Sequence, residues 1–471
     1  MSLDKNKTER KSCLLLEPYT ICNGSLLRDL VYLPGVSRPL KEGEELEVDE
    51  DAYQFFEQFA TEYPCLTFDP ILDDDGVDRC SYPLSCYLVC GTQASKPRDN
   101  AIYVLKCANM HALKDEASDK EDGVEDDEDI DDDEEDASKS RDSQMYAAKI
   151  AHHGGINRIR YQRVSPTAAI CASWNDVGKG KVQVWNLSNS ISAVANLADR
   201  QPTPRNNRVN KTTTGQQPDT NVEMKEKPLY SFDGHHCEGF ALDWSPVKLG
   251  RLASGDTRGN IYLWQMHEAG TWAVDHRPYS AHKKSVEDIQ WSPNEDSVFA
   301  SCGCDSTIRL WDIRVSPAQA CVCTVSNAHA TDVNVCSWNR LDTSLLVTGG
   351  DDGVIKIWDL KHIQHQLPAA TFKHHSGPIT SVHWSIDDST VFAASGEDDQ
   401  TTVWDLALEP DDPGHDEQSV DDAEPLTVPP QLLFVHMGQK QVKEVRWHPN
   451  LKGTLLSTSQ TGFDIFRSIN M

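Results

Sequence analysis

The amino-acid sequence predicts an all-β fold, a seven-bladed β-propeller. The first observation is a pattern that occurs four times: a histidine, a tryptophan nine residues later, and a second tryptophan twenty-nine residues after the histidine. The copies are His235, Trp244 and Trp264; His282, Trp291 and Trp311; His329, Trp338 and Trp358; and His375, Trp384 and Trp404. They are spaced by 47, 47 and 46 residues. A nearly constant period of this size is typical of stacked or radial repeats.

The second observation is alternation of apolar and polar residues between turn residues. In the second copy it covers residues 285–291, 298–303 and 307–313. Such stretches predict short antiparallel strands. Three repeats end their third strand on a Trp-Asp pair, at Trp311-Asp312, Trp358-Asp359 and Trp404-Asp405. This dipeptide at this spacing is typical of WD-repeat propeller blades.

The number of blades follows from the aromatic residue of each third strand. Trp185 precedes the four clear repeats, Phe466 follows them, and a weaker strand at 101–106 carries Tyr103, which makes seven. The step from Trp185 to Trp264 is 79 residues, 32 more than one period. Residues 188–228, within this step, are rich in Asn, Thr, Gln and Pro. We therefore expect a propeller over residues 80–471 with a disordered loop insert at 188–228.

A set of polar residues recurs within the blades. The sets are His282, Ser301, Asp305 and Trp311 in one repeat, and His329, Thr348, Asp352 and Trp358 in the next. A hydrolase triad is the alternative interpretation, but an enzyme needs one such set beside a cleft, whereas a buried hydrogen-bond relay is needed in each blade. We interpret these tetrads as structural and expect no catalytic residue among them.

Two further repeats depart from the tetrad spacing. His375, Ser395 and Asp399 fit a third relay with a displacement of one residue. The repeat that ends at Trp264 has Arg258 where the aspartate should stand. We expect that this blade lacks the complete relay.

The sequence predicts no enzyme, cofactor or metal site. Residues 178–181 lack both the spacing and the Ser or Thr of a phosphate loop. Cys302 with Cys304, and Cys321 with Cys323, have Cys-x-Cys spacing, but they fall in predicted strands, and structural zinc sites usually have Cys-x2-Cys pairs on turns. The same reasoning applies to residues 235–237. No stretch approaches the ~18 apolar residues of a membrane span, so we expect a soluble protein without a membrane partner.

The net charge of −30 is concentrated in two segments. Residues 115–136 hold sixteen acidic residues and one lysine, and residues 409–424 hold eight acidic residues and no basic one. Together they contribute −23 and leave −7 for the rest of the chain. We expect an acidic disordered insert at 112–143 and an acidic loop at 409–430 that screen a strongly basic partner. The insert's principal carboxylates are Asp126, Asp127, Glu128, Asp131, Asp132, Asp133, Glu134 and Glu135.

Two alternatives limit this interpretation of the charge. Acidic low-complexity loops often confer only solubility. Direct binding of nucleic acid is disfavoured, since it would require a basic surface. Ser118 and Ser419 each have an acidic residue three positions later, which is typical of acidophilic kinase sites, although simply exposed serines would give the same pattern.

The segment before the propeller carries a helical pattern. After an N-terminal extension at 1–49, the residues Tyr53, Phe56 and Phe59 recur at a spacing of three among acidic side chains. This pattern predicts one amphipathic helix within residues 50–70, ended by Pro64.

Two motifs resemble the retinoblastoma-associated histone-binding WD-repeat proteins. Residues 62–67 (Glu-Tyr-Pro-Cys-Leu-Thr) resemble that family's Glu-Trp-Pro-Ser-Leu-Thr element, and residues 429–436 resemble its Pro-Pro-x-Leu-Leu-Phe-x-His stretch. In that family, an N-terminal helix on the side of the propeller and a loop of the sixth blade form a groove for a histone helix. The resemblance implies a partner-binding helix with Tyr53, Phe56 and Phe59, and a partner-binding loop with Asp421, Asp422, Glu424, Pro429 and Pro430.

A closer resemblance extends over nearly the whole chain. Residues 31–35, 43–46, 154–158, 239–246 and 285–288 resemble strings of the glutamate-rich WD-repeat protein family that lie outside the general Trp-Asp consensus. The resemblance implies a non-enzymatic protein of the nucleus and nucleolus that binds core histones. It further implies roles in replication licensing and large-subunit assembly, with a basic large-subunit ribosomal protein and with licensing and pre-ribosomal factors as partners.

A different function remains open at the end of one third strand. Trp311-Asp312-Ile313-Arg314 resembles the Trp-Asp-x-Arg motif by which substrate receptors dock to cullin-RING ubiquitin ligases. Asp312 and Arg314 would then contact the ligase adaptor. Most Trp-Asp pairs only end a strand, so the motif by itself is weak evidence.

Overall fold

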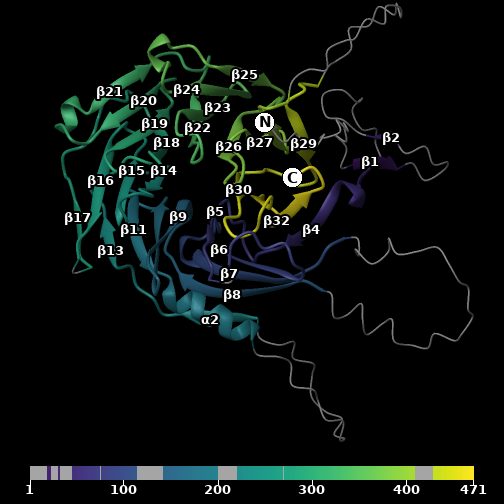
Figure 1. The fold of residues 1–471 in the computed structure, drawn as a ribbon. Coiled ribbons are helices and arrows are strands. Elements are labelled where there is room, and N and C mark those ends of the chain that lie inside the picture. Colours follow the sequence, from purple (N-terminus) through teal and green to yellow (C-terminus); the bar gives the residue numbers. More distant parts are fainter. Residues whose placement is uncertain are drawn as a thin grey trace, which may run out of the picture.

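The computed structural model describes residues 19–22, 30–31, 45–74, 76–113, 142–199, 220–268, 270–408 and 428–471. Seven sheets stand around a central axis, so the predicted seven-bladed β-propeller is confirmed (Figure 1). In each blade the strands succeed one another antiparallel from the axis outward, which places the turns between the first and second and between the third and fourth strands on one face.

The strands of the first four blades follow the sequence. Blade 1 comprises β5 (Thr67–Ile71), β6 (Leu84–Gly91), β7 (Ala101–Met110) and β8 (Gln144–Ala151); blade 2, β9 (Ile156–Ser165), β10 (Ala168–Asn175), β11 (Lys181–Asn186) and β13 (Tyr230–Phe232); blade 3, β14 (Ala241–Trp244), β15 (Arg251–Gly255), β16 (Ile261–Met266) and β17 (Trp272–Val274); blade 4, β18 (Val286–Trp291), β19 (Val298–Gly303), β20 (Ile308–Asp312) and β21 (Cys321–Val325).

The remaining strands complete the ring. Blade 5 comprises β22 (Val333–Trp338), β23 (Leu345–Gly350), β24 (Val354–Asp359) and β25 (Ala370–Lys373); blade 6, β26 (Ile379–Trp384), β27 (Val391–Gly396), β28 (Thr401–Asp405) and β29 (Leu432–His436); blade 7, β30 (Glu444–Trp447), β31 (Leu455–Thr458), β32 (Phe463–Ser468) and β4 (Tyr53–Phe59). A separate small sheet holds β1 (Tyr19–Cys22), β2 (Leu30–Val31) and β3 (Glu45–Val48), and single 3-10 turns lie at Glu50–Ala52, Pro97–Asp99, Pro317–Gln319 and Ile363–His365.

The predicted amphipathic helix at 50–70 is wrong, because this segment contains a 3-10 turn and then β4. Tyr53 and Phe55 are 2% and 0% exposed, so the buried side chains follow the two-residue period of a strand. Phe56, which the helical pattern placed on the same face as Tyr53 and Phe59, is only half-buried. The cause is β32, whose open edge pairs antiparallel with β4 and brings Phe59 opposite Phe463.

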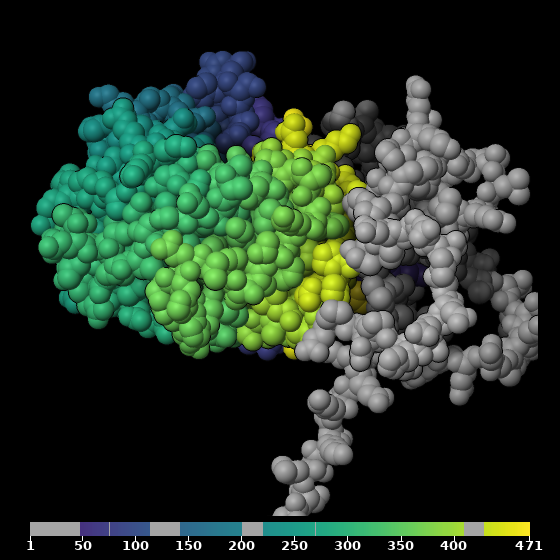
Figure 2. All heavy atoms as spheres, turned by 90° about the horizontal axis from the view of Figure 1, so that it is seen from above, coloured from purple at the N-terminus to yellow at the C-terminus, as the bar shows by residue number. Residues whose placement is uncertain are grey.

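β4 closes the propeller with strands from both ends of the chain. The other three strands of blade 7 come from residues 444–468, so β4, an early strand of the chain, lies beside strands from its C-terminal end (Figure 1, Figure 2). The propeller therefore starts at residue 53 and not at 80 as predicted. Closure of this kind pairs an edge that would otherwise be open.

The region 188–228 is not wholly the disordered insert that its composition predicted. It contains α2 (Ser188–Ala198) and β12 (Asn221–Met224), which extends blade 1 as a fifth strand parallel to β8. α2 packs Val194, 0% exposed, and Ile191 onto the hydrophobic cluster of blades 1 and 2. These two packed residues are three positions apart, a helical spacing that the abundant Ser and Asn around them obscured. Residues 200–219 lie outside the described part.

The first tryptophan of the repeat links neighbouring blades. It ends the innermost strand, and its indole N–H donates to a backbone carbonyl of the preceding blade: Trp244 to Arg160 at 2.9 Å, Trp291 to Asp243 at 3.1 Å and Trp384 to Ser337 at 3.1 Å. Trp338 instead bonds the carbonyl of Thr343 in its own blade. In three of the four repeats, the tryptophan at this constant spacing therefore makes the same blade-to-blade contact.

Candidate protein-binding surface

The two tetrads form the relays that the sequence predicts. His282 lies 3.0 Å from Asp305 through Nδ1 and 2.7 Å from the Ser301 hydroxyl through Nε2, and the Trp311 indole donates to the same hydroxyl at 2.8 Å. Burial lowers the pKa of His282. Burial alone would raise the pKa of Asp305, but the hydrogen bond and charge of His282 hold it below its usual value.

The second relay repeats this geometry in the next blade. His329 contacts Asp352 at 3.1 Å and Thr348 at 2.9 Å, and Trp358 donates to Thr348 at 2.9 Å. Both relays tie the loop before a first strand to the body of its blade. Neither relay lines the pocket between Tyr87 and Ile191 or the small cavity between Asp243 and Arg446.

The third relay exists, but two of its predicted members are wrong. His375 contacts Asp398 at 2.9 Å and the Thr402 hydroxyl at 2.9 Å, and Trp404 donates to Thr402 at 2.8 Å. Asp399 has φ 62° in the turn, and its carboxylate accepts from the backbone of Gln441. Ser395 bonds Thr380 instead. Asp398 stands 23 residues after His375, as Asp305 stands after His282, so this relay has no displacement at its aspartate. The third strand supplies the hydroxyl.

The repeat ending at Trp264 also has a complete relay, contrary to the prediction. His235 contacts Asp256 at 2.9 Å and Ser254 at 2.8 Å, and Trp264 donates to Ser254 at 2.9 Å. Asp256 stands two residues before Arg258 and accepts that residue's backbone N–H. The aspartate can thus occupy more than one position in this turn, which fixed spacing does not reveal.

A separate set of side chains joins β4 to β29 on the side of the propeller. The Tyr53 hydroxyl lies 2.8 Å from Nδ1 of His436, and Nε2 of His436 lies 3.0 Å from Asp464. His436 stacks on Phe466 with ring centroids 4.1 Å apart. We call Tyr53, His436 and Asp464 the closure relay, because it connects blade 6, the N-terminal strand and β32.

Half-buried apolar side chains lie over this junction. Phe56 of β4, Leu433 of β29 and Leu113 beyond β7 pack against one cluster that includes Tyr53. Pro430, which precedes β29, is exposed, and Pro429 is half-buried. We call Phe56, Leu113, Leu433 and Pro430 the side surface. Its members come from segments far apart in the sequence, and sequence reasoning missed Leu113, since only its tertiary contacts set it apart.

Both acidic segments join the chain close to the side surface. The backbone N–H of Leu113 donates to the Gln54 carbonyl of β4 at 3.0 Å, and the Ser143 hydroxyl donates to Glu57 of β4 at 2.6 Å. The insert between them thus leaves and returns beside β4. The second segment, residues 409–424, is followed by the double proline at 429–430, shortly before β29. Burial raises the pKa of Glu57, which lies beneath the insert's ends.

Several predicted site residues lie elsewhere or outside the described part. Phe59 is 7% exposed and belongs to the core under blade 1, so it does not contribute to the side surface. The eight named carboxylates of the insert, the acidic residues of the second segment and the two serines fall on residues that the structure does not describe: Asp126, Asp127, Glu128, Asp131, Asp132, Asp133, Glu134, Glu135, Asp421, Asp422, Glu424, Ser118 and Ser419.

The ligase motif is exposed at the end of β20. The Arg314 guanidinium, 67% exposed, forms an ion pair with Asp312 at 2.6 Å. This contact holds the arginine beside its own strand on the face that carries the turns between third and fourth strands. Within the described ranges, no group of three or more His, Cys, Asp or Glu residues is arranged to hold a metal ion.

Comparison with known proteins identifies the family. Residues 43–111 match the family model of the histone-binding protein RBBP4, which is also described as a component of the CAF1 complex, and residues 275–312, 319–359 and 366–405 match the WD domain, G-beta repeat. Glutamate-rich WD repeat-containing protein 1 of Dictyostelium discoideum is 40% identical, with 93% of this chain and 85% of the relative covered. The chain belongs to the glutamate-rich WD-repeat-containing protein family.

Two other relatives of this protein match similar shares of its chain. Ribosome assembly protein rrb1 of Schizosaccharomyces pombe is 34% identical over 93% of this chain and 84% of its own length. Protein HEAT STRESS TOLERANT DWD 1 of Arabidopsis thaliana is 40% identical over 94% and 92%. The WD40 propeller of Doa1 is 14% identical with a TM-score of 0.52, over 88% of this chain and 96% of that domain, and shows the fold alone.

These findings establish a coarse function. The protein is a WD-repeat scaffold with a segment of the histone-binding type that contains β4, and its relatives point to a non-enzymatic role. Histone-binding and ribosome-assembly relatives also indicate a nuclear location. None of the helices in the described ranges has both the length and the apolar character needed to cross a membrane.

Proposed function

We propose that this protein is a chaperone and scaffold for basic proteins, with core histones and a basic large-subunit ribosomal protein as clients. It would act in the nucleus and nucleolus, in chromatin regulation at replication licensing and in large-subunit assembly, alongside licensing and pre-ribosomal factors. The description of the matched family model supports a histone client, and the printed name of rrb1 supports ribosome assembly.

The observation that carries the proposal is the convergence at the side surface. Phe56 and Leu433 offer apolar contact from two adjacent outer strands, while the ends of both acidic segments lie beside them. The two segments carry twenty-four carboxylates between them. A basic chain with an apolar face would meet complementary groups of both kinds at this place.

Physical chemistry separates the contributions of the two components. Attraction between solvent-exposed charges is screened beyond roughly 8 Å at physiological ionic strength, so binding through the acidic segments should weaken steeply with salt. Contact with Phe56 and Leu433 should respond little to salt, because it depends on burial of apolar surface. The salt dependence therefore reports which component dominates for each client.

The experiment compares the full chain with a variant that lacks residues 115–136. Both are titrated with labelled core histones and, separately, with a basic large-subunit ribosomal protein across a salt series. Loss of salt-steep binding on deletion would support a general acidic shield. Binding that survives deletion and high salt but is lost in Phe56→Ala would place recognition at the side surface. Full binding in both variants would refute the proposal.

A second candidate function is that of a substrate receptor for a cullin-RING ligase. Two observations favour it: the exposed Arg314, and the term DWD in the name of the Arabidopsis relative. Arg314→Ala should abolish recovery of the ligase adaptor. Arg277→Ala is a matched control, since Arg277 is 76% exposed and pairs with Asp275 at 2.9 Å in the same two-residue arrangement. Retention of the adaptor by Arg314→Ala would exclude this function.

A further inference from the structure

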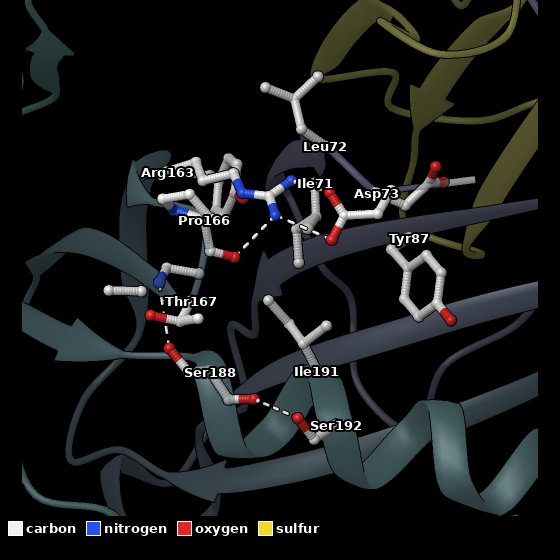
Figure 3. A pocket seen from close by; sticks show the side chains of 14 residues that line it. Ile71, Leu72, Asp73, Tyr87, Arg163, Pro166, Thr167, Ser188, Ile191 and Ser192 are labelled. Atoms are coloured by element: carbon white, nitrogen blue, oxygen red, sulfur yellow. Dashed lines mark hydrogen bonds and ion pairs between the residues drawn. The ribbon is translucent and has the colours of Figure 1, made fainter. Parts of the chain in front are cut away.

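A pocket between blades 1 and 2 lies apart from the side surface. It has a volume of about 410 Å³ and is bounded by the β5–β6 loop, the β9–β10 turn and the N-terminal end of α2 (Figure 3). Both loops connect first and second strands, so the pocket belongs to the face opposite the relay histidines. Its volume is within the ~300–1,000 Å³ typical of ligand sites.

One part of the pocket wall is apolar and aromatic, whereas Arg163, Ser188 and Ser192 make other parts polar. In the apolar part, Ile71 comes from β5, Tyr87 from β6 and Ile191 from α2 (Figure 3), and Tyr161 of β9 also lines the pocket. The ring of Tyr87 already accepts an ammonium group, since Nζ of Lys106 lies 5.2 Å from its centroid. Aromatic walls of this kind accommodate both aliphatic side chains and cationic groups.

The rim carries carboxylates next to exposed apolar side chains. Asp74, 81% exposed, contacts Arg163 at 2.6 Å, and Asp73 contacts Arg79 at 2.5 Å, so both arginines near the rim are engaged. In the same loop, Asp78 is exposed, Leu72 is 41% exposed and Val77 is 71% exposed. Burial raises the pKa of Tyr161. Arg163 opposes this increase, whereas the nearby carboxylates Asp69, Asp74 and Asp73 add to it.

Apolar exposure continues from the pocket onto blade 3. The Gln162 side chain donates to the Ser245 carbonyl at 2.9 Å and accepts from the backbone of Gly250 at 2.7 Å, which fixes the β14–β15 loop beside β9. That loop exposes Val247 by 45% and Leu249 by 48%. These exposed apolar side chains on the neighbouring loop offer additional contact area to a partner bound at the pocket.

We propose that this pocket is a docking site for a partner segment that combines a large apolar side chain with neighbouring lysine or arginine. The apolar side chain would enter between the walls, and the basic groups would meet the exposed carboxylates of the β5–β6 loop: Asp74, which would be shared with Arg163, and Asp78. Asp73, Asp74 and Asp78 outnumber the two arginines beside them, Arg79 and Arg163, so an acidic segment would be disfavoured. This site is independent of the side surface, so either can fail without the other.

Methyl NMR of the full-length protein with labelled isoleucines tests the proposal. The probes are three short synthetic peptides of equal length: one with leucines among lysines and arginines, one with serine in place of leucine, and one with glutamate in place of the basic residues. We expect the first peptide alone to shift the methyl signals of Ile71 and Ile191. The signal of Ile386, which packs against the cluster below the side surface, should stay in place.

A blocking variant makes the outcome specific. Ser192 is exposed on α2 at the pocket, whereas Asn196 is exposed one turn further along and does not line it. Ser192→Trp should weaken binding about tenfold, and Asn196→Trp should leave it unchanged; Leu72→Ser, at the rim, should also weaken it. Equal shifts with the glutamate or serine peptide, no shift at Ile71 and Ile191, or equal binding by both tryptophan variants would overturn the proposal.

Discussion

The hydroxyl of Tyr53 lies 2.8 Å from Nδ1 of His436, across 383 positions of sequence. Tyr53 belongs to the strand that closes blade 7, and His436 ends the outer strand of blade 6. This buried hydrogen bond therefore joins the strand that closes the ring to one of the strands that carry the side surface. A change that loosens β4 should alter both the stability of the propeller and the surface on which a basic client would dock.

Tyr53→Phe should destabilise the propeller. It leaves Nδ1 of His436 buried without its partner, and an unsatisfied buried polar group costs about 1–3 kcal/mol. The free energy of unfolding from urea denaturation measures this cost. Tyr63→Phe is the control, since Tyr63 is a half-buried tyrosine of the same N-terminal segment. Equal stability of the two variants would contradict a structural role for the closure relay.

Phe56→Ala and Phe59→Ala should have different effects. Phe59 is 7% exposed in the core, so its truncation should cost about 3–5 kcal/mol of stability. Phe56 is half-buried at the side surface, so its truncation should mainly weaken client binding and lower stability less. Thermal unfolding and histone titration of each single variant distinguish the two. Strong histone binding by Phe56→Ala would remove this side chain from the client-binding surface.

Thr402→Val should destabilise blade 6 by about 1–3 kcal/mol, because His375 and Trp404 both lose the hydroxyl that they contact. Ser395→Ala should lower the stability less, since the Ser395 hydroxyl bonds the Thr380 hydroxyl and takes no part in the relay. Urea denaturation of both variants makes the comparison. A larger loss for Ser395→Ala would assign the relay to the serine that was predicted with a displacement of one residue.

Asp243→Asn should stabilise the protein more at pH 8 than at pH 5. Burial raises the pKa of Asp243 to about 7 from an ordinary 3.8. A raised carboxyl pKa gives stability that is complete below pH 4 and is lost as the pH rises through 7, on the order of 1 kcal/mol per pH unit. The amide cannot ionise and still accepts from the backbone of Trp291. A pH-independent difference in unfolding free energy would argue against this assignment.

Glu444→Gln should change the stability with the opposite dependence on pH. Burial alone would raise the pKa of Glu444, but Arg160, Arg446 and Arg158 hold it below its usual value. The carboxylate thus contributes stability above its unfolded pKa near 4.5 that is lost as the pH falls. Glu444→Gln should therefore be most destabilising at neutral pH, with the difference from the unsubstituted protein shrinking on acidification.

The sequence by itself determined the number of blades and two complete relays. Each of the four clear repeats is one local unit with a period of 46 or 47 residues, so His282 and Trp311 meet through neighbouring strands whose spacing is constant. Contacts within such a unit leave a periodic pattern. The charge of the acidic segments also follows directly from the sequence, because charge depends on composition and not on fold.

Only the tertiary structure decided the contacts that join distant segments. β4 is a strand because β32, some 400 residues later, presents an unpaired edge, and no pattern within residues 50–63 contains that partner. Asp256 acts in place of position 258, where the repeat spacing predicts the aspartate, because the conformation of the turn sets which side chain faces the histidine. The side surface arises in the same way, since ring closure alone brings Phe56, Leu113 and Leu433 to one cluster.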